Sequence, residues 1–290
     1  MKQRKGKNKR KNRKRSEIRK HKLKPKKLRM FGVNAAGIKC KLDSLKNILE
    51  RLNPQIWAVQ ETKLKPNERI KCDATDNFQM FYLYRHESQG GGLVIGVDKE
   101  IESTLVREGN DLVEAIVVQV VIGKLTIKII VGYGPQENAP KEKKDKFWEF
   151  LEDEIIKADL ENHGLIIQMD GNLHAGPEVI KNDPNRQNNN GKLFTEFLER
   201  NPNVFVANNL SCCEGSITRK RILENRTEIA VLDFFIMNEI MRPFLIKMVI
   251  DEERNFCLSN FSQMKQNRRV IETDHNLMYS DFDITEKRSA

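Results

Sequence analysis

Apolar residues along the sequence follow two different patterns, a helical spacing and short continuous runs. A three- and four-residue spacing predicts a helix over Leu42–Leu52, which Asn53-Pro54 closes because proline cannot continue a helix. The same spacing predicts helices over Phe147–Leu160 and Lys192–Leu198. Between these segments lie short runs rich in Val, Ile and aromatic residues, which are typical of strands. The chain therefore alternates helical and extended segments.

The predicted strands are short, and several end in Gly, Pro or polar residues. Some follow one another closely, as hairpins do, and others are separated by a helix, as in crossover units. This mixture predicts an α/β protein with two mixed β-sheets packed face to face and helices outside. The expected strands are Leu28–Val33, Ile56–Gln60, Phe78–Tyr84, Gly92–Val97, Val113–Ile122, Leu125–Tyr133, Gly164–Met169, Val204–Ala207, Val231–Met237 and Leu277–Phe282.

Positive charge is concentrated at the start of the chain. Residues 1–29 hold 17 of the 51 Lys and Arg residues beside a single acid, Glu17, so the remainder carries 34 basic and 40 acidic residues. A segment this polar buries too little apolar surface to offset its ordering entropy, so we expect residues 1–29 to be a disordered polybasic tail. Residues 30–284 then form one domain, and residues 285–290 form a short C-terminal tail.

The tail has two functional interpretations and one plain alternative. Its basic run, residues 9–15, is typical of a nuclear localisation signal or of an arm that binds DNA phosphates. The alternative is a solvated extension that only aids solubility. The sequence shows neither a secretory signal nor a stretch of 18 apolar residues, so we expect an intracellular, nuclear protein that does not bind membranes.

Polar side chains follow the predicted strands at the points where the strands end. Asn34 follows the first strand, Glu61 the second and Tyr133 the long strand, and Asp170-Gly171-Asn172 follows a later one. Loops at strand ends are where a rigid scaffold displays chemical groups. Each residue alone has a plain reading, since Asp-Gly is a common turn signal and Tyr133 can simply end a strand. Their combination indicates a shared site.

The residues of this expected site suit hydrolysis of a phosphodiester. Carboxylates such as Glu61 and Asp274 are ligands that Mg²⁺ or Mn²⁺ prefers, whereas the sequence lacks the Cys and His clusters of zinc sites. An Asp near the metal, such as Asp170, can deprotonate a water molecule. Neutral donors and a protonated His275 can stabilise the charge of the transition state. We expect no cofactor besides the metal.

The order of these residues resembles the endonuclease/exonuclease/phosphatase superfamily, which includes abasic-site endonucleases and the endonuclease domains of non-LTR retrotransposons. The resemblance covers residues 30–284 and implies a four-layer α/β sandwich. It also implies a role for each matching position. The metal ligands would be Glu61, Asn34 and Asp274; the catalytic residues would be Asp170, Asn172, Tyr133, His275 and its partner Asp233.

Several positions depart from the superfamily pattern. Met169 stands where Gly commonly precedes the Asp-x-Asn motif, and Ala36 stands where abasic-site enzymes have an acid. Thr273 replaces a common Ser, and Ala230-Val231 replace Ser/Thr-Arg. No matched catalytic residue is missing, so we expect activity. The absent acid at position 36 weakens the abasic-site interpretation.

Other local features favour the retroelement side of the superfamily. These are Gly90-Gly91-Gly92-Leu93 before a strand, Asn188–Lys192 before a helix, and Ile217–Arg221 in a loop. The Ile217–Arg221 loop contains the first residues of the main basic cluster of the body. This cluster could bind DNA phosphates, or it could be a solvated basic hairpin, and the sequence favours neither interpretation. The basic residues concerned are Arg219, Lys220, Arg221 and Arg226.

Three functions remain open on sequence alone. The first is a Mg²⁺-dependent DNA endonuclease of retroelement type that nicks one strand. The second is a phosphatase acting on a phosphoinositide or another small phosphoester, since the superfamily uses one kind of site for both and the acidic body does not specially favour DNA. The third is an inactive DNA-binding remnant, against which the retained Glu61, Asp170 and His275 argue.

Overall fold

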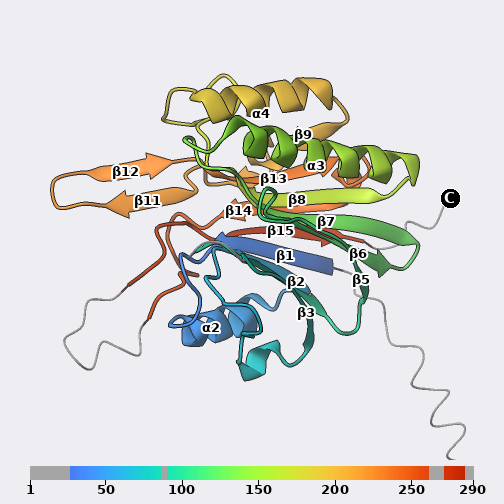
Figure 1. Cartoon of the computed structure of the whole chain (residues 1–290). Helices are drawn as coiled ribbons and strands as arrows, with labels where there is room; N and C mark the ends of the chain where they lie inside the picture. Colours follow the sequence, from blue (N-terminus) through green and yellow to red (C-terminus); the bar gives the residue numbers. More distant parts are fainter. Residues whose placement is uncertain (1–26, 86–89, 261–270, 285–290) are drawn as a thin grey trace, which may run out of the picture.

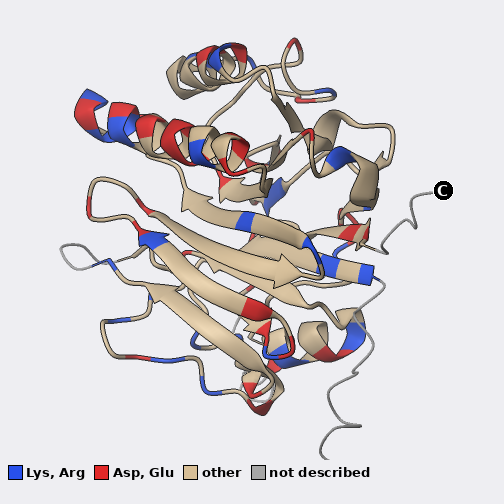
Figure 2. Ribbon diagram, turned by 90° about the vertical axis from the view of Figure 1, so that its right-hand side faces the viewer, with Lys and Arg blue, Asp and Glu red and all other residues tan. Residues whose placement is uncertain are grey.

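The computed structural model describes residues 27–85, 90–260 and 271–284, which form a layered α/β sandwich (Figure 1). Two large sheets are stacked in the middle, with α2 (Leu42–Leu52) below them and α3 (Lys141–Leu160) and α4 (Asn189–Arg200) above. Lys, Arg, Asp and Glu gather on the helices and loops and are sparse along the strands of both sheets (Figure 2). The expected four-layer arrangement of two mixed sheets flanked by helices is confirmed.

The first sheet, on which α2 packs, has seven strands in the order β10-β14-β15-β1-β2-β4-β3. Its central pair β1 and β2 is parallel, with Asn34 opposite Gln60 at their ends, and β15 runs antiparallel to β1. The strands are β1 (Lys27–Asn34), β2 (Ile56–Gln60), β3 (Phe78–Leu83), β4 (Leu93–Asp98), β10 (Cys213–Glu214), β14 (Leu245–Ile250) and β15 (Met278–Asp283).

The second sheet has six strands in the order β5-β6-β7-β8-β13-β9. Here β7 and β8 are parallel and end together at Tyr133 and Asp170, while β13 runs antiparallel to β8 and begins at Asp233, opposite Asp170. The strands are β5 (Glu102–Glu108), β6 (Ala115–Ile122), β7 (Leu125–Tyr133), β8 (Gly164–Asp170), β9 (Val204–Val206) and β13 (Asp233–Asn238).

Three apolar clusters hold the layers together, one at each interface between layers. Between the two sheets, residues such as Ile95 and Ile129 interlock. Phe147 of α3 and Phe194 of α4 pack on the outer face of the second sheet. On the other side, Leu45 of α2 packs on the first sheet. Burial of apolar surface at these three interfaces is the main favourable term for folding.

The structure contains strands that the sequence pattern did not predict. β5 is largely exposed, and its sequence lacks the apolar run by which strands were identified. β14 was not predicted although five of its six residues are apolar. α3 begins at Lys141 rather than at Phe147, because its first turns are charged and carry no apolar period. A further two-stranded sheet, β11 (Arg219–Ile222) with β12 (Thr227–Ala230), forms a hairpin.

The predicted N-terminal tail lies almost wholly outside the described residues. β1 begins at Lys27, so the last residues assigned to the tail belong to the first strand, where Leu28 is buried. Residues 1–26 and the expected C-terminal tail, 285–290, are not described. Within the described ranges, the helices lack the combination of length and apolar character that spanning a bilayer requires.

Candidate active site

The predicted site residues meet at one edge of the sandwich. Asn34 ends β1 and Glu61 follows β2, while Tyr133 ends β7 and Asp170 ends β8. Parallel strands bring their carboxyl ends to the same edge, so each sheet contributes a pair. β13 and β15 run the opposite way and therefore begin at this edge. Their starts place Asp233 and the Asp274-His275 loop beside the other residues.

Three side-chain hydrogen bonds cross from the first sheet to the second at this edge. Asn34 Nδ2 donates to Asp170 Oδ2 over 2.7 Å. The hydroxyl of Tyr133 donates to Glu61 Oε1 over 2.5 Å. His275 Nδ1 and Asp233 Oδ2 are 2.8 Å apart. Each bond joins two residues of the predicted site, so the site is formed by both sheets together.

Asp170 and Asp233 are the most deeply buried ionisable groups of the site. Asp170 is 1% exposed and accepts hydrogen bonds on both oxygens, from Asn34 on Oδ2 and from the backbone N–H of Asn172 on Oδ1. Burial raises its pKa, and the charge of Asp233 raises it further, while His275 and the hydrogen bonds oppose this. A carboxylate whose pKa is moved toward neutrality is suited to exchange a proton.

His275 is held as a cation by its neighbours. Burial alone would lower its pKa, but the carboxylates of Asp233 and Asp170 outweigh that effect and raise the pKa to about 9. Its Nε2 lies 3.9 Å from Asp170 Oδ2 and 4.0 Å from Asp274 Oδ1, too far to bond either. The imidazolium is therefore fixed at Nδ1 and turns Nε2 toward the centre of the site.

Glu61 and Asp274 form the more open part of the site, with 20% and 29% of their side chains exposed. Burial would raise the pKa of Glu61, but the Tyr133 hydroxyl and Lys63 outweigh it, so the pKa is lowered. For Asp274, burial is outweighed by His275 and Arg219, and the pKa is again lowered. Both carboxylates are ionised at neutral pH, as a divalent cation requires.

Part of the site has a strained backbone. Glu61 and Asn172 have φ angles of 47° and 49°, and Ala36 has 47°. This left-handed region is unfavourable for residues other than Gly and, to a lesser extent, Asn. Such strain is typical of functional sites, because the surrounding structure must impose it. At position 36, where abasic-site enzymes have an acid, the backbone N–H donates to Asn34 Oδ1 over 2.8 Å.

Several contacts of the site could not be predicted from the sequence. The Nε2 of Gln136 donates to both the Tyr133 hydroxyl and Asn172 Oδ1, at 2.9 Å each. Thr273 Oγ1 donates to the backbone oxygen of Asn34 over 2.6 Å. Gln136 follows Tyr133-Gly134-Pro135 directly, and this position is its only sequence signal. Met169, which stands where Gly is common in the superfamily, is fully buried in the core beneath α3 and α4.

The four basic residues predicted to bind nucleic acid lie on the β11–β12 hairpin, which projects from the body at the left of Figure 1. Lys220, Arg221 and Arg226 are exposed. Arg219, at the base of the hairpin, instead pairs with Asp274, its Nε 2.7 Å from Oδ2. The backbone N–H of Lys220 also donates to the oxygen of Asp274 over 2.8 Å, which joins the hairpin directly to the site.

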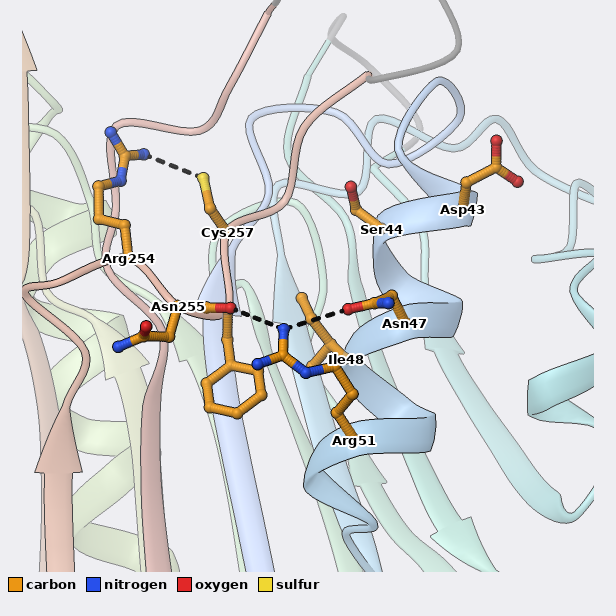
Figure 3. A pocket seen from close by; sticks show the side chains of 9 residues that line it. Asp43, Ser44, Asn47, Ile48, Arg51, Arg254, Asn255 and Cys257 are labelled. Atoms are coloured by element: carbon orange, nitrogen blue, oxygen red, sulfur yellow. Dashed lines mark hydrogen bonds between the residues drawn. The ribbon is translucent and has the colours of Figure 1, made fainter.

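Two hollows are lined by residues of the described ranges. One, of about 450 Å³, runs from Asp274 along Lys220 and Arg221 to Arg254. The other, of about 320 Å³, lies between α2 and the segment that holds Arg254 and Cys257 (Figure 3). In this second hollow Arg51 covers the ring of Phe256, 4.9 Å from its centroid. Only the first hollow contains a residue of the predicted site.

Solved structures of several nucleases share this fold. The endonuclease domain of TRAS1, a telomere-specific non-LTR retrotransposon, has a TM-score of 0.66 at 14% identity, covering 89% of this chain and 100% of that chain. The AP endonuclease LMAP from Leishmania major has a TM-score of 0.63 at 14% identity, with 89% and 88% covered. The 3′-5′ exonuclease NExo from Neisseria meningitidis has 0.59 at 15% identity, with 88% and 100% covered.

The chain therefore has the fold of the endonuclease/exonuclease/phosphatase superfamily, as the resemblance of its motifs implied. The sequence itself matches no model of a known protein family and no curated protein. At identities this low the likeness concerns the fold, and the chemistry must be argued from the residues of this chain.

Proposed function

We propose that this protein is a divalent-metal-dependent phosphodiester hydrolase, and specifically a DNA endonuclease that nicks one strand. The observation that carries the proposal is the position of Asp170. Its carboxylate is buried, bonded to Asn34, and 3.9 Å from the Nε2 of a cationic His275, with Glu61 and Asp274 at the same edge. A proton acceptor, a cationic donor and two ionised carboxylates thus lie at one edge of the sandwich.

Glu61 and Asp274 would hold the metal, together with the amide oxygen of Asn34. The donors are all oxygens, which favours Mg²⁺ or Mn²⁺ over zinc. Within the described ranges one group of three metal-binding side chains is compact, namely Asp170, Asp233 and His275. His275 Nδ1 is already bonded to Asp233 there, so we assign that group to proton handling. When bound at Glu61, the cation would stabilise negative charge on the phosphate.

Asp170 is the general base of the proposed reaction. Both of its oxygens are held by hydrogen bonds, so its orientation toward a water molecule is fixed. The water oxygen bonds to phosphorus, its proton passes to Asp170, and the bond from phosphorus to the 3′ oxygen breaks. The leaving 3′ oxygen takes a proton from solvent, which leaves a 3′-hydroxyl and a 5′-phosphate.

His275, Asn172 and Tyr133 would hold the scissile phosphate. The Nε2–H of the His275 imidazolium faces the space between Asp170 and Asp274 and can donate to a phosphate oxygen. Asn172 Nδ2 donates one hydrogen to the Gly134 oxygen, which fixes the amide and leaves its second hydrogen for substrate. The Tyr133 proton is directed at Glu61 and would turn to phosphate only when Glu61 binds the cation.

The hairpin supports DNA rather than a small phosphoester as the substrate. Its exposed Lys220 and Arg221 line the hollow that begins at Asp274, so positive charge extends from the site along this hollow. A duplex presents a row of phosphates that such a surface can contact, whereas a small phosphoester would fill only the site. The likeness to the TRAS1 domain and the Ala at position 36 support a retroelement type over abasic-site repair.

One assay tests the proposal. The protein is incubated with supercoiled plasmid, with an abasic-site duplex and with inositol phosphates, each with Mg²⁺ or with EDTA. We expect plasmid nicking that EDTA and Asp170→Ala both abolish. Phosphate release from inositol phosphates without nicking would favour the phosphatase alternative. No turnover of any substrate, with DNA still bound, would leave the inactive remnant as the explanation.

A further inference from the structure

The loop that carries Glu61 is held in an unfavourable conformation by a neighbouring glycine segment. Glu61 and Lys63 have φ angles of 47° and 53°, which L side chains rarely adopt. The backbone N–H of Thr62 donates to Gly92 O over 3.0 Å, and that of Lys63 donates to Gly91 O over 2.8 Å. These two bonds tie the strained loop to the start of β4.

The glycine segment is in turn held by a buried carboxylate, Glu114, which directly precedes β6 and is 6% exposed. Glu114 Oε1 accepts the backbone N–H of Gly92, and Oε2 is paired with the guanidinium of Arg85. A carboxylate taken out of water requires such partners, so its position is narrowly defined. Glu114 therefore fixes Gly91 and Gly92 and, through them, the loop of Glu61.

Glu114 also holds Tyr133, the hydrogen-bond partner of Glu61. The backbone N–H of Tyr133 donates to Glu114 O over 2.8 Å. Arg85, held by Glu114, lies with Cζ 5.9 Å from the centroid of the Tyr133 ring. The contacts form a closed ring from Glu114 through Gly92 and Thr62 to Glu61, then across the 2.5 Å bond to Tyr133 and back to Glu114.

We propose that Glu114 is a positioning residue of the active site, which sets Glu61 and Tyr133 relative to one another. This inference rests on the proposed function, in which Glu61 holds the metal. The proposal also accounts for the glycine at position 91, in the middle of the Gly-Gly-Gly run. A Cβ at Gly91 would lie 2.4 Å from Glu114 Oε1 and 2.6 Å from Arg85 Cζ, whereas a Cβ at Gly90 would meet nothing within 4 Å.

The first test compares Glu114→Gln with Glu154→Gln. Glu154 is a matched control, because it is a buried glutamate of α3 whose salt-bridge partners, among them Arg107 and Lys157, are not residues of the site. We expect Glu114→Gln to lower kcat for plasmid nicking about tenfold to a hundredfold and to weaken Mn²⁺ binding, with KM for DNA unchanged. Glu154→Gln should lower only the thermal stability. A Glu114→Gln enzyme with wild-type kcat and Mn²⁺ affinity would overturn the inference.

The second test uses the two glycines. Both have positive φ, 62° at Gly91 and 109° at Gly90, so alanine strains the backbone at either position. Only at Gly91 does the new methyl group displace Glu114 and Arg85. We therefore expect Gly91→Ala to reproduce the kcat and Mn²⁺ defects of Glu114→Gln, and Gly90→Ala to lack them. Equal defects in the two alanine variants would contradict a role for Glu114.

A third readout separates this inference from the proposed function. Tyr133 is labelled with fluorotyrosine, and its ¹⁹F resonance is assigned by its loss in Tyr133→Phe. The resonance should shift in Glu114→Gln and Gly91→Ala and stay in place in Glu154→Gln and Gly90→Ala. If the wild type cleaves no DNA, the proposed function fails, yet the resonance and Mn²⁺ affinity still decide the role of Glu114. If the Tyr133 resonance and the Mn²⁺ affinity are both unchanged in Glu114→Gln and Gly91→Ala, Glu114 does not position the site.

Discussion

The guanidinium of Arg219 lies on the carboxylate of Asp274, with Nε and Nη2 each 2.7 Å from Oδ2. Asp274 is a proposed metal ligand, so the arginine and a bound cation would share one carboxylate. We expect Arg219→Ala to tighten Mn²⁺ binding in the absence of DNA about fivefold, since a partly exposed ion pair contributes up to about 1 kcal/mol. Isothermal titration measures this, with Arg221→Ala as the control on the same strand. Weaker Mn²⁺ binding by Arg219→Ala would show instead that Arg219 holds Asp274 in the position that binds the metal.

Loss of the general base should remove activity without unfolding the protein. We expect Asp170→Asn to lower kcat for plasmid nicking about 10²- to 10⁴-fold, which is the usual contribution of a general base. Asp183→Asn is the matched control, because Asp183 is also buried and accepts backbone N–H groups, from Gly176 and Asn185. Nicking rates and thermal melts are compared for both variants. An active Asp170→Asn enzyme would exclude this residue as the base.

The rate of nicking should depend on pH through Asp170 and His275. The reaction needs Asp170 deprotonated, so the rate rises on the acid side as this raised pKa is passed. It needs His275 protonated, so the rate falls as pH rises through about 9. Asp233 raises both pKa values, and we expect Asp233→Asn to move both limbs of the profile to lower pH. A pH–rate series at saturating Mg²⁺ and DNA measures this. If both limbs of the pH–rate profile stay in place in Asp233→Asn, the profile does not report Asp170 and His275.

His275 should also make folding stability depend on pH. Its folded pKa, about 9, lies above the ordinary value of 6.5. The protonated imidazole therefore contributes stability that is fully present below pH 6.5 and is lost as pH rises toward 9. We expect the urea midpoint of the wild type to fall across this window more steeply than that of His275→Gln. Identical pH dependence of the two proteins would show that His275 is not held as a cation.

The hairpin should determine affinity for DNA through its charges. We expect Lys220→Gln and Arg221→Gln each to raise KM for plasmid and to lower the slope of log K against log salt by about one, as loss of one phosphate contact does. Lys124→Gln is the control, because Lys124 is exposed in the β6–β7 turn, at the opposite end of the strand that finishes at Tyr133. Salt-dependent binding by fluorescence anisotropy tests this. An unchanged slope would mean that the hairpin does not touch DNA.

The polybasic N-terminal segment should direct the protein to the nucleus. We expect deletion of residues 1–26 to abolish nuclear accumulation of a fluorescent fusion, since 15 of the 17 basic residues of the predicted tail lie there. The deletion stops before Lys27, where β1 begins, so the whole of β1 is kept. Replacing residues 1–26 by a neutral linker of equal length controls for size. Continued nuclear accumulation of the truncated protein would contradict the prediction that residues 1–26 contain a nuclear localisation signal.

The clustering of the candidate site residues could be predicted largely because they end or begin buried strands. Asn34, Glu61 and Asp170 follow apolar runs that a single sequence reveals, and parallel pairing then brings them to one edge. Pairings that depend on an irregular segment could not be predicted. Arg219 reaches Asp274 only through the register of an exposed hairpin, in which it lies opposite Ala230. Glu114 accepts the N–H of Gly92, which lies in a loop with positive φ angles. Apart from its glycines, this loop has no sequence pattern from which its conformation could be predicted.

The bonds from Asn34 to Asp170, from Tyr133 to Glu61 and from His275 to Asp233 all join one sheet to the other. Neither half of the sandwich holds a usable set of groups by itself. A slide of one sheet over the other by a few ångströms would break these bonds while leaving every strand paired within its own sheet. The proposed activity should therefore depend on how the two sheets are aligned. On heating, the proposed nicking activity should be lost at a lower temperature than the secondary structure.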